Sequence, residues 1–199
     1  MSLIKQLHSK ALQHRLIDTG AEMNLETIFA LVRDMPYQRA SDRKPETIIA
    51  EWRGTCSGKH YTLQALFAEL GYRSDVVACT SIEPIAENII TPELRPLWEN
   101  AAGRLVDVHN YLLLDLPGGK MIIDATWPLG SQKHGLKVNR SFCLGEDQQI
   151  ACQPLQNWLI PDGADPQAFK DKLLSENFSS DELAFREAFI QALGDWLAQ

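Results

Sequence analysis

The apolar residues in the first quarter of the chain recur at helical spacing. The clearest i, i+3, i+4, i+7 pattern covers residues 25–32, and a looser one runs from Ser2 to about Asp18. A third, shorter pattern over residues 48–52 runs into Gly54. The sequence therefore predicts helices in all three segments before residue 54.

A longer helix is predicted directly after Gly54. Its apolar residues, Leu63, Leu66, Phe67 and Leu70, follow the same spacing, and Gly71 supplies a left-handed stop. Cys56 falls in the first turn, where free N–H groups and the positive end of the helix dipole favour a thiolate over a thiol. Residues 56, 60, 63 and 67 share one face, so the sulfur is expected above the side that packs into the core. A buried, inert cysteine is the alternative interpretation.

The middle of the chain has the pattern of β-strands. A first strand is predicted over residues 73–81, and 91–103 is expected to be a loop or short helix. Residues 106–116 form a second strand, Pro117-Gly118-Gly119 a turn, and residues 120–126 the return strand. A three-residue connection cannot hold a helical crossover, so this pair is predicted to be antiparallel.

The register of this hairpin decides whether His109 can reach Asp124. With residues 117–118 at the centre of the turn, Asp124 falls opposite Tyr111, two residues from His109 on the same face. Such diagonal neighbours lie about 7–8 Å apart, within side-chain reach. With residues 118–119 at the centre, the gap doubles. The Pro-Gly pair favours the first register, with a bulge at Gly119 allowed for.

Beyond Pro128 the pattern is irregular until two helices close the chain within residues 168–198. They are predicted over 168–177 and 181–197, with Ser180 as the cap of the second. The apolar stripe of the second helix consists of Leu183, Phe185, Ala188, Phe189, Leu193, Trp196 and Leu197. This stripe is expected to pack in the core, with a dimer contact as the alternative. The protein is therefore expected to be a monomer or a homodimer.

Composition adds limits on the fold and the compartment. With 199 residues, of which 45% are hydrophobic and 23% charged, the chain is expected to form a single domain over residues 1–199. It is long enough to bury a core without disulfides or a structural metal. The four cysteines show no CxxC pair, so free thiols are expected. No signal peptide or membrane span is evident, so we expect a cytoplasmic protein without a membrane association.

The charge pattern argues against one class of partner. The formal net charge is −7 at pH 7, whereas nucleic-acid binding usually needs a basic face. The few basic residues near Arg43 lie in a polar loop, which is typical of a solvated surface. We therefore expect no nucleic-acid partner.

Cys56, His109 and Asp124 follow one another in the order nucleophile, base and orienting carboxylate, as a thiol acyl-transfer enzyme requires. Together with the segments Met35-Pro36-Tyr37, Gly54-Thr55-Cys56, Leu70-Gly71-Tyr72 and Asp124-Ala125-Thr126-Trp127, they make residues 35–130 resemble the transglutaminase-like family of the papain-like thiol enzymes. The resemblance implies an α+β fold in which a Cys-bearing helix packs on an antiparallel sheet. It also implies hydrolysis or transamidation of amide bonds in a peptide, protein or small amide, through a thioester and without a cofactor or metal.

The chain departs from the family pattern at several places. Asn110 and Tyr111 follow His109 where the family often has Ala-Trp, and the last 70 residues show no resemblance. The oxyanion donor of the family also lacks a clear counterpart. The backbone N–H of Cys56 and the indole N–H of Trp52 are candidates, and Trp52 fits a core position as well.

Three alternatives remain open from the sequence. The Arg-Gly-x-Cys segment and the interval from His109 to Asp124 are similar to the arylamine N-acetyltransferases. A domain that keeps the fold could bind peptides without catalysis. Finally, Cys56 and His60 share a helix face and could bind zinc together with His109.

Overall fold

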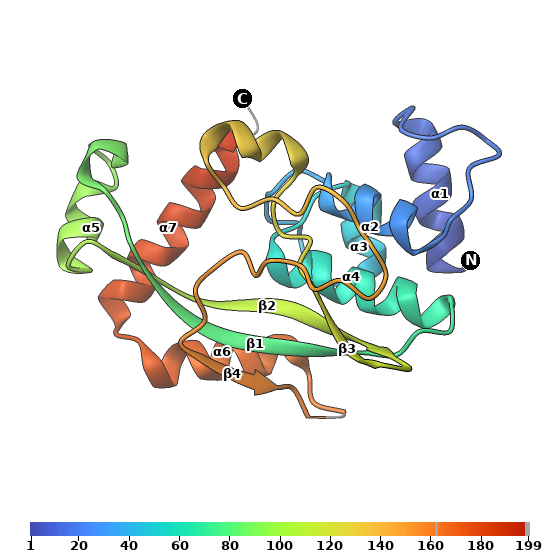
Figure 1. Cartoon of the computed structure of the whole chain (residues 1–199). Coiled ribbons are helices and arrows are strands. Elements are labelled where there is room, and N and C mark those ends of the chain that lie inside the picture. Colours follow the sequence, from blue (N-terminus) through green and yellow to red (C-terminus); the bar gives the residue numbers. More distant parts are fainter. Residues whose placement is uncertain (162, 198–199) are drawn as a thin grey trace.

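The computed structural model describes residues 1–161 and 163–197 (Figure 1). The helices are α1 (Leu3–Gln13), α2 (Leu25–Arg33), α3 (Pro45–Glu51), α4 (Cys56–Glu69), α5 (Arg95–Asn100), α6 (Pro166–Asn177) and α7 (Ser180–Leu197), with 3₁₀ turns at Glu87–Ile89 and Leu129–His134. The strands are β1 (Ser74–Pro84), β2 (Arg104–Leu116), β3 (Gly119–Ile123) and β4 (Gln156–Leu159). Of the described helices, none is long and apolar enough to cross a membrane.

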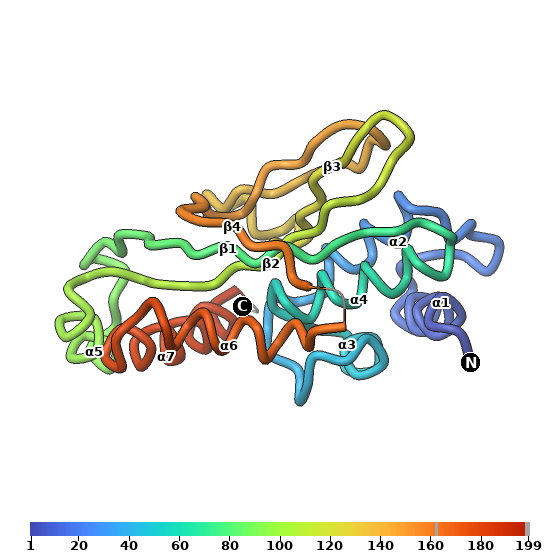
Figure 2. Tube along the Cα trace, turned by 90° about the horizontal axis from the view of Figure 1, so that it is seen from below, coloured from blue at the N-terminus to red at the C-terminus, as the bar shows by residue number. Residues whose placement is uncertain are grey.

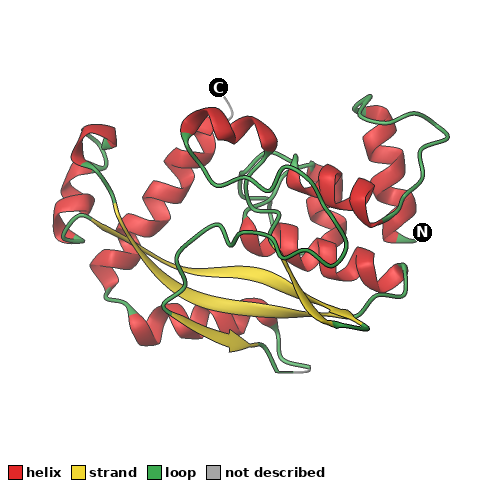
Figure 3. Ribbon diagram, in the orientation of Figure 1, coloured by secondary structure: helices red, strands yellow, loops and turns green. Residues whose placement is uncertain are grey.

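The strands form one antiparallel sheet in the order β3-β2-β1-β4. Helices α4, α6 and α7 pack on one face of this sheet, and the irregular segment between β3 and β4 crosses the other (Figures 1 and 2). Figure 3 separates the helices, the strands and this long loop by colour. The α+β class predicted from the sequence is confirmed, as is the packing of the Cys-bearing helix on the antiparallel sheet, where it contacts β1 and β2.

Both faces of the central strands are covered, which explains why the apolar residues 76–79 of β1 are consecutive rather than alternating. Ala78 packs toward α6, whereas Val77 and Cys79 pack beneath the segment that precedes β4. Successive side chains of a strand point to opposite faces, so both sets can be buried only if each face has a cover.

The hairpin has the register that the Pro-Gly pair favours, with Leu116 opposite Gly119. However, β3 ends at Ile123 and does not continue to Thr126. The chain bends there because the Asp124 carboxylate accepts the N–H of Thr126 (3.0 Å), a local turn that competes with the ladder. Asp124 is thereby placed at the end of the strand, where its side chain is free to reach neighbouring elements.

Other boundaries also differ from prediction. The first helix ends at Gln13 because Arg15 adopts a left-handed conformation, with φ of 58°. Ser179, rather than Ser180, caps α7: its hydroxyl accepts the N–H of Glu182, whose carboxylate returns the bond. Strand β4 was not predicted, because this four-residue edge strand is largely exposed and carries no alternating pattern.

Close helix packing fixes the start of α4. A Cβ at Gly58 would lie 2.5 Å from the Cδ1 atom of Ile48 in α3, so any larger residue would force the Ile48 side chain to shift. On the same helix, His60, Leu63 and Phe67 are fully buried. The face of α4 that begins at Cys56 therefore points into the core, as predicted.

Candidate active site

Cys56 opens α4. The preceding residue, Thr55, is extended, and the first turn follows immediately, so the sulfur lies at the positive end of the helix dipole. Only 3% of Cys56 is exposed. The thiol is thus placed by the helix start and covered by other parts of the chain.

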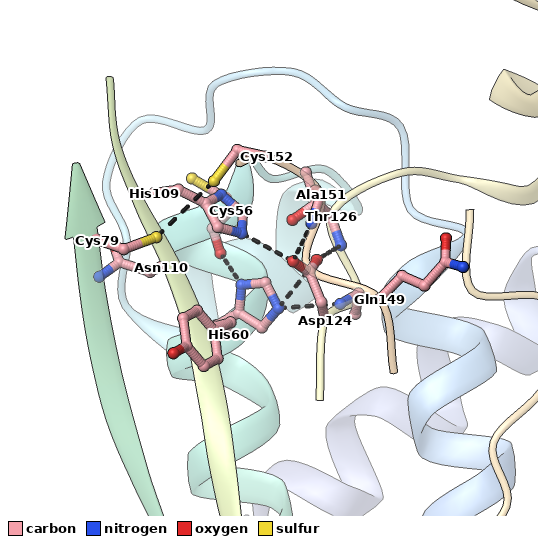
Figure 4. Close-up of polar contacts among 12 residues, drawn as sticks. Cys56, His60, Cys79, His109, Asn110, Asp124, Thr126, Gln149, Ala151 and Cys152 are labelled. Carbon is pink, nitrogen blue, oxygen red and sulfur yellow. Dashed lines mark hydrogen bonds and ion pairs between the residues drawn. The ribbon is translucent and has the colours of Figure 1, made fainter. Parts of the chain in front are cut away.

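His109 and Asp124 meet as the hairpin register requires (Figure 4). The His109 Nε2–H donates to Asp124 Oδ2 at 2.8 Å, and both side chains are almost fully buried. Burial alone would raise the pKa of Asp124, but the charge and hydrogen bond of His109 hold it well below its usual range. Because Nε2 is committed to the carboxylate, Nδ1 is the nitrogen that remains for the thiol.

The thiol of Cys56 is poised as a thiolate. Burial raises its pKa, but the nearby Lys170 cation and the interaction with the His109 imidazole outweigh burial and lower the pKa to about 6. In turn, Asp124 and Cys56 raise the pKa of His109 well above its ordinary value, against the effect of burial. The arrangement favours a thiolate and an imidazolium side by side at neutral pH.

His60 is a structural partner of this group, a role that the sequence did not reveal. Its Nδ1–H donates to the carbonyl of Cys56 (2.8 Å), and its Nε2 accepts the N–H of Ala125 (2.9 Å). This pattern fixes a neutral ring, and burial lowers the pKa of His60 to about 4. His60 thus ties the start of α4 to the segment that carries Asp124.

The same two bonds argue against the zinc alternative. A histidine ligand must offer a free ring nitrogen to the metal, and both nitrogens of His60 are engaged within the protein. Across the described residues, no three His, Cys, Asp or Glu side chains are arranged to hold a metal ion.

The neutral state of His60 predicts a loss of stability in mild acid. Its folded pKa lies below the unfolded value of about 6.5, so between pH 6.5 and 4.5 the unfolded chain takes up a proton that the folded protein excludes. Stability should fall over this window by about 2–3 kcal/mol. Urea denaturation at both pH values measures the change.

A matched pair of variants isolates this effect. His60→Gln should be less stable at pH 6.5 but should lose much less on acidification, since no imidazole remains to be protonated. His8→Gln, at a half-buried position on α1, should behave like the wild type. An unchanged pH dependence in His60→Gln would contradict the assignment.

Asn110, the residue after His109 that differs from the transglutaminase-like pattern, has a structural role. It is fully buried on β2, and its Oδ1 accepts the hydroxyl hydrogen of Ser57 at 2.9 Å. Its amide nitrogen donates to the carbonyl of Val77. Asn110 therefore anchors the first turn of α4 to the sheet, next to Cys56.

Lys170 is a second residue that the sequence did not place in the site. It is buried on α6, with Nζ 3.7 Å from Cys56 Sγ and 3.1 Å from the Ser57 hydroxyl. Its other neighbour is the carboxylate of Asp107, which also binds the guanidinium of Arg186 on α7 (2.6 Å). The only signal in the sequence is that Lys170 shares a helix face with Leu173 and Leu174, at i+3 and i+4.

A cavity of about 60 Å³ adjoins the thiol on this side. Cys56, Ser57, Tyr37, Asp107, Gln167 and Lys170 are among its lining residues. Within the described part of the chain, the buried Oε1 of Gln167 has no hydrogen-bond partner. The C-terminal helices thus supply a polar wall to a small space beside the sulfur.

Trp52 lies away from the cavity beside Cys56. Its ring packs in the main hydrophobic core and stacks on His14 at the end of α1, with ring centroids 4.9 Å apart. Trp52 does not line the cavity beside Cys56. Its position is that of a packing residue, so we do not retain its indole as an oxyanion donor.

The structure therefore brings Cys56, His109 and Asp124 together and adds His60 and Lys170 to them. All five side chains are almost completely buried. They come from α4, from the hairpin of β2 and β3, and from α6, three parts of the chain that are distant in the sequence. Comparisons of this chain with protein-family models, with curated proteins and with solved structures found no match.

Proposed function

We propose that the protein is a thiol acyl-transfer enzyme that acts on the amide bond of a peptide, protein or small amide. The observation that supports this is a His109–Asp124 hydrogen bond of 2.8 Å beside a buried thiol whose pKa is lowered to about 6 by Lys170 and His109. Such a chain of groups activates a sulfur nucleophile and orients its base.

In the proposed reaction, the Cys56 thiolate attacks the carbonyl carbon of the substrate. The backbone N–H of Cys56 and the ammonium of Lys170 stabilise the negative charge on the carbonyl oxygen. His109 then gives its Nδ1 proton to the departing amine, which leaves a thioester on Cys56. Water or a second amine, deprotonated by His109, releases the acyl group and restores the thiolate.

Trapping the thioester tests the proposal. The protein is mixed with a panel of activated amides and esters and quenched in acid, and its intact mass is measured. We expect one acyl group per chain on Cys56, and none on Cys56→Ala. Equal labelling of both proteins, or no labelling by any member of the panel, would contradict the proposal.

The thiolate state can be tested without a substrate. Alkylation of Cys56 by iodoacetamide, followed at that residue by peptide mass spectrometry, should be half-maximal near pH 6. Lys170→Met removes the cation 3.7 Å from the sulfur and should move this midpoint upward by roughly 1–3 pH units. Lys172→Met, on the exposed side of the same helix, should leave it unchanged. A midpoint near the ordinary thiol pKa in the wild type would mean that the site holds an inert cysteine.

A second candidate is a peptide-binding domain without catalysis. The observation in its favour is that only 3% of Cys56 is exposed, so the thiol is closed to a large substrate in this structure. Under the first proposal, a substrate larger than a small acyl group requires α6 to move away from the sulfur. Peptide binding that is unaffected by Cys56→Ala, in a protein whose thiol has an ordinary pKa, would favour this second function.

A further inference from the structure

Two cysteines outside the proposed triad lie in contact beside it (Figure 4). Cys79 is fully buried in β1, and Cys152 is half-buried in the segment before β4. Their sulfur atoms are 3.8 Å apart, and both are free thiols. They are 73 residues apart in the sequence, so only the fold brings them together.

The segment that carries Cys152 also holds the catalytic carboxylate of the proposed site. The N–H of Ala151, the residue before Cys152, donates to Asp124 Oδ2 at 2.8 Å. The side chain of Gln148 accepts the backbone N–H of Asp124, also at 2.8 Å. Any movement of Cys152 therefore acts directly on a hydrogen bond of Asp124.

Cys79, by contrast, is held in place. It lies opposite His109 of β2 on one side and Asn157 of β4 on the other. A strand residue with partners on both sides cannot shift without disturbing both ladders. When the two sulfurs approach each other, it is therefore the segment around Cys152 that moves.

We infer that Cys79 and Cys152 form a reversible disulfide that regulates the proposed active site through Asp124. The oxidant is a peroxide. The sulfur of Cys152 attacks it: an S–O bond forms, the O–O bond breaks, and water is released from hydrogen peroxide. The thiol of Cys79 then attacks the sulfenic sulfur, the S–S bond forms, and the oxygen leaves as a second water. A dithiol reductant reverses the change by thiol–disulfide exchange.

The two thiols differ in accessibility and pKa in the way that this order of oxidation steps requires. Cys152 is the accessible one, and the hydrogen bond from the Cys79 thiol lowers its pKa. That same interaction, together with burial, raises the pKa of Cys79. Cys152 is therefore the first to react with an oxidant, and Cys79 resolves the product.

In the disulfide the sulfurs must lie about 2 Å apart, compared with 3.8 Å between the free thiols. Closing this gap draws Cys152 toward β1 and displaces the N–H of Ala151 from Asp124. The carboxylate then loses a partner, and His109 loses part of its orientation. We expect the oxidised protein to be several-fold less active, an effect that rests on the proposed function.

The pairing itself is tested without any activity. Cys56→Ala protein is treated with hydrogen peroxide, the remaining thiols are blocked, and the protein is digested without reduction. We expect a linked peptide pair that contains Cys79 and Cys152 and disappears with dithiothreitol. The exposed Cys143 should stay unpaired. Absence of the linked pair, or pairing of Cys152 with Cys143, would overturn the inference whatever the enzyme does.

The regulatory effect is tested with the proteins that retain Cys56. After mild peroxide treatment, wild type and Cys143→Ser should lose the same share of activity, and dithiothreitol should restore it. Cys152→Ser should lose markedly less activity, because it cannot form the disulfide and is inactivated only by direct oxidation of Cys56. If Cys152→Ser loses as much as the wild type, the disulfide does not control the site, although the proposed function could still stand.

Discussion

Replacing Cys56 by alanine should abolish turnover of any substrate found for this protein. Without a sulfur there is no thioester, and the neighbouring Ser57 hydroxyl donates its hydrogen to Asn110 rather than to a base. Loss of the nucleophile in such triads lowers kcat by on the order of 10⁶-fold. Initial rates with the best substrate of the activated amide and ester panel, at saturating concentration, measure the effect.

The control for this variant is Cys143→Ala, at an exposed cysteine outside the proposed triad. It should keep the activity of the wild type. Cys56→Ala should also remain folded, because the contacts of the sulfur with Ser57 Oγ (3.9 Å) and Lys170 Nζ (3.7 Å) are long. A folded Cys56→Ala protein with wild-type turnover would place the chemistry elsewhere and favour the peptide-binding function.

Asp124→Asn should have the second largest effect, with a lower kcat but measurable residual activity. The amide can still contact the His109 ring, but it cannot stabilise the imidazolium, and it can orient the wrong tautomer. In a comparable triad this change costs about 10⁴-fold in kcat. Without the carboxylate, the pKa of His109 should fall and the iodoacetamide midpoint of Cys56 should rise. Rates and alkylation profiles of the same preparation measure both effects.

The same substitution should destabilise the fold. The carboxylate accepts hydrogen bonds from His109, Thr126 and Ala151, and the NH₂ group of asparagine must face at least one of these donors. We expect a loss of about 1–3 kcal/mol in the free energy of unfolding. Asp115→Asn, which alters an exposed ion pair with Lys120, should change stability by less than about 0.5 kcal/mol. An Asp124→Asn protein with unchanged stability and kcat would remove Asp124 from the proposed triad.

Local sequence signals predicted the elements that carry the proposed triad. The helix that begins at Cys56 is defined by its apolar spacing and by Gly71, whose φ of 87° provides the expected stop. The hairpin is defined by its Pro-Gly turn, and this turn fixes the register that faces His109 toward Asp124. Each signal spans fewer than about 20 residues, which is why one sequence sufficed to find it.

The residues that complete the site could not be found in this way. His60 stood out in the sequence only as a possible zinc ligand, and its two hydrogen bonds depend on where the chain turns after β3. Lys170 lies 114 residues from Cys56, in a helix with no resemblance to the family. Strand β4 was missed because its residues are mostly exposed and do not alternate.

The sequence by itself determined the order and approximate bounds of most of these elements, and it singled out a cysteine, a histidine and an aspartate that could meet. Only the tertiary structure decided the chemical state of those groups. The pKa of Cys56 depends on Lys170 and His109, and the tautomer of His60 depends on the backbone of Cys56 and Ala125. Charge and hydrogen-bond energies vary steeply with distance. They are therefore set by packing between distant segments, which local patterns in the chain do not encode.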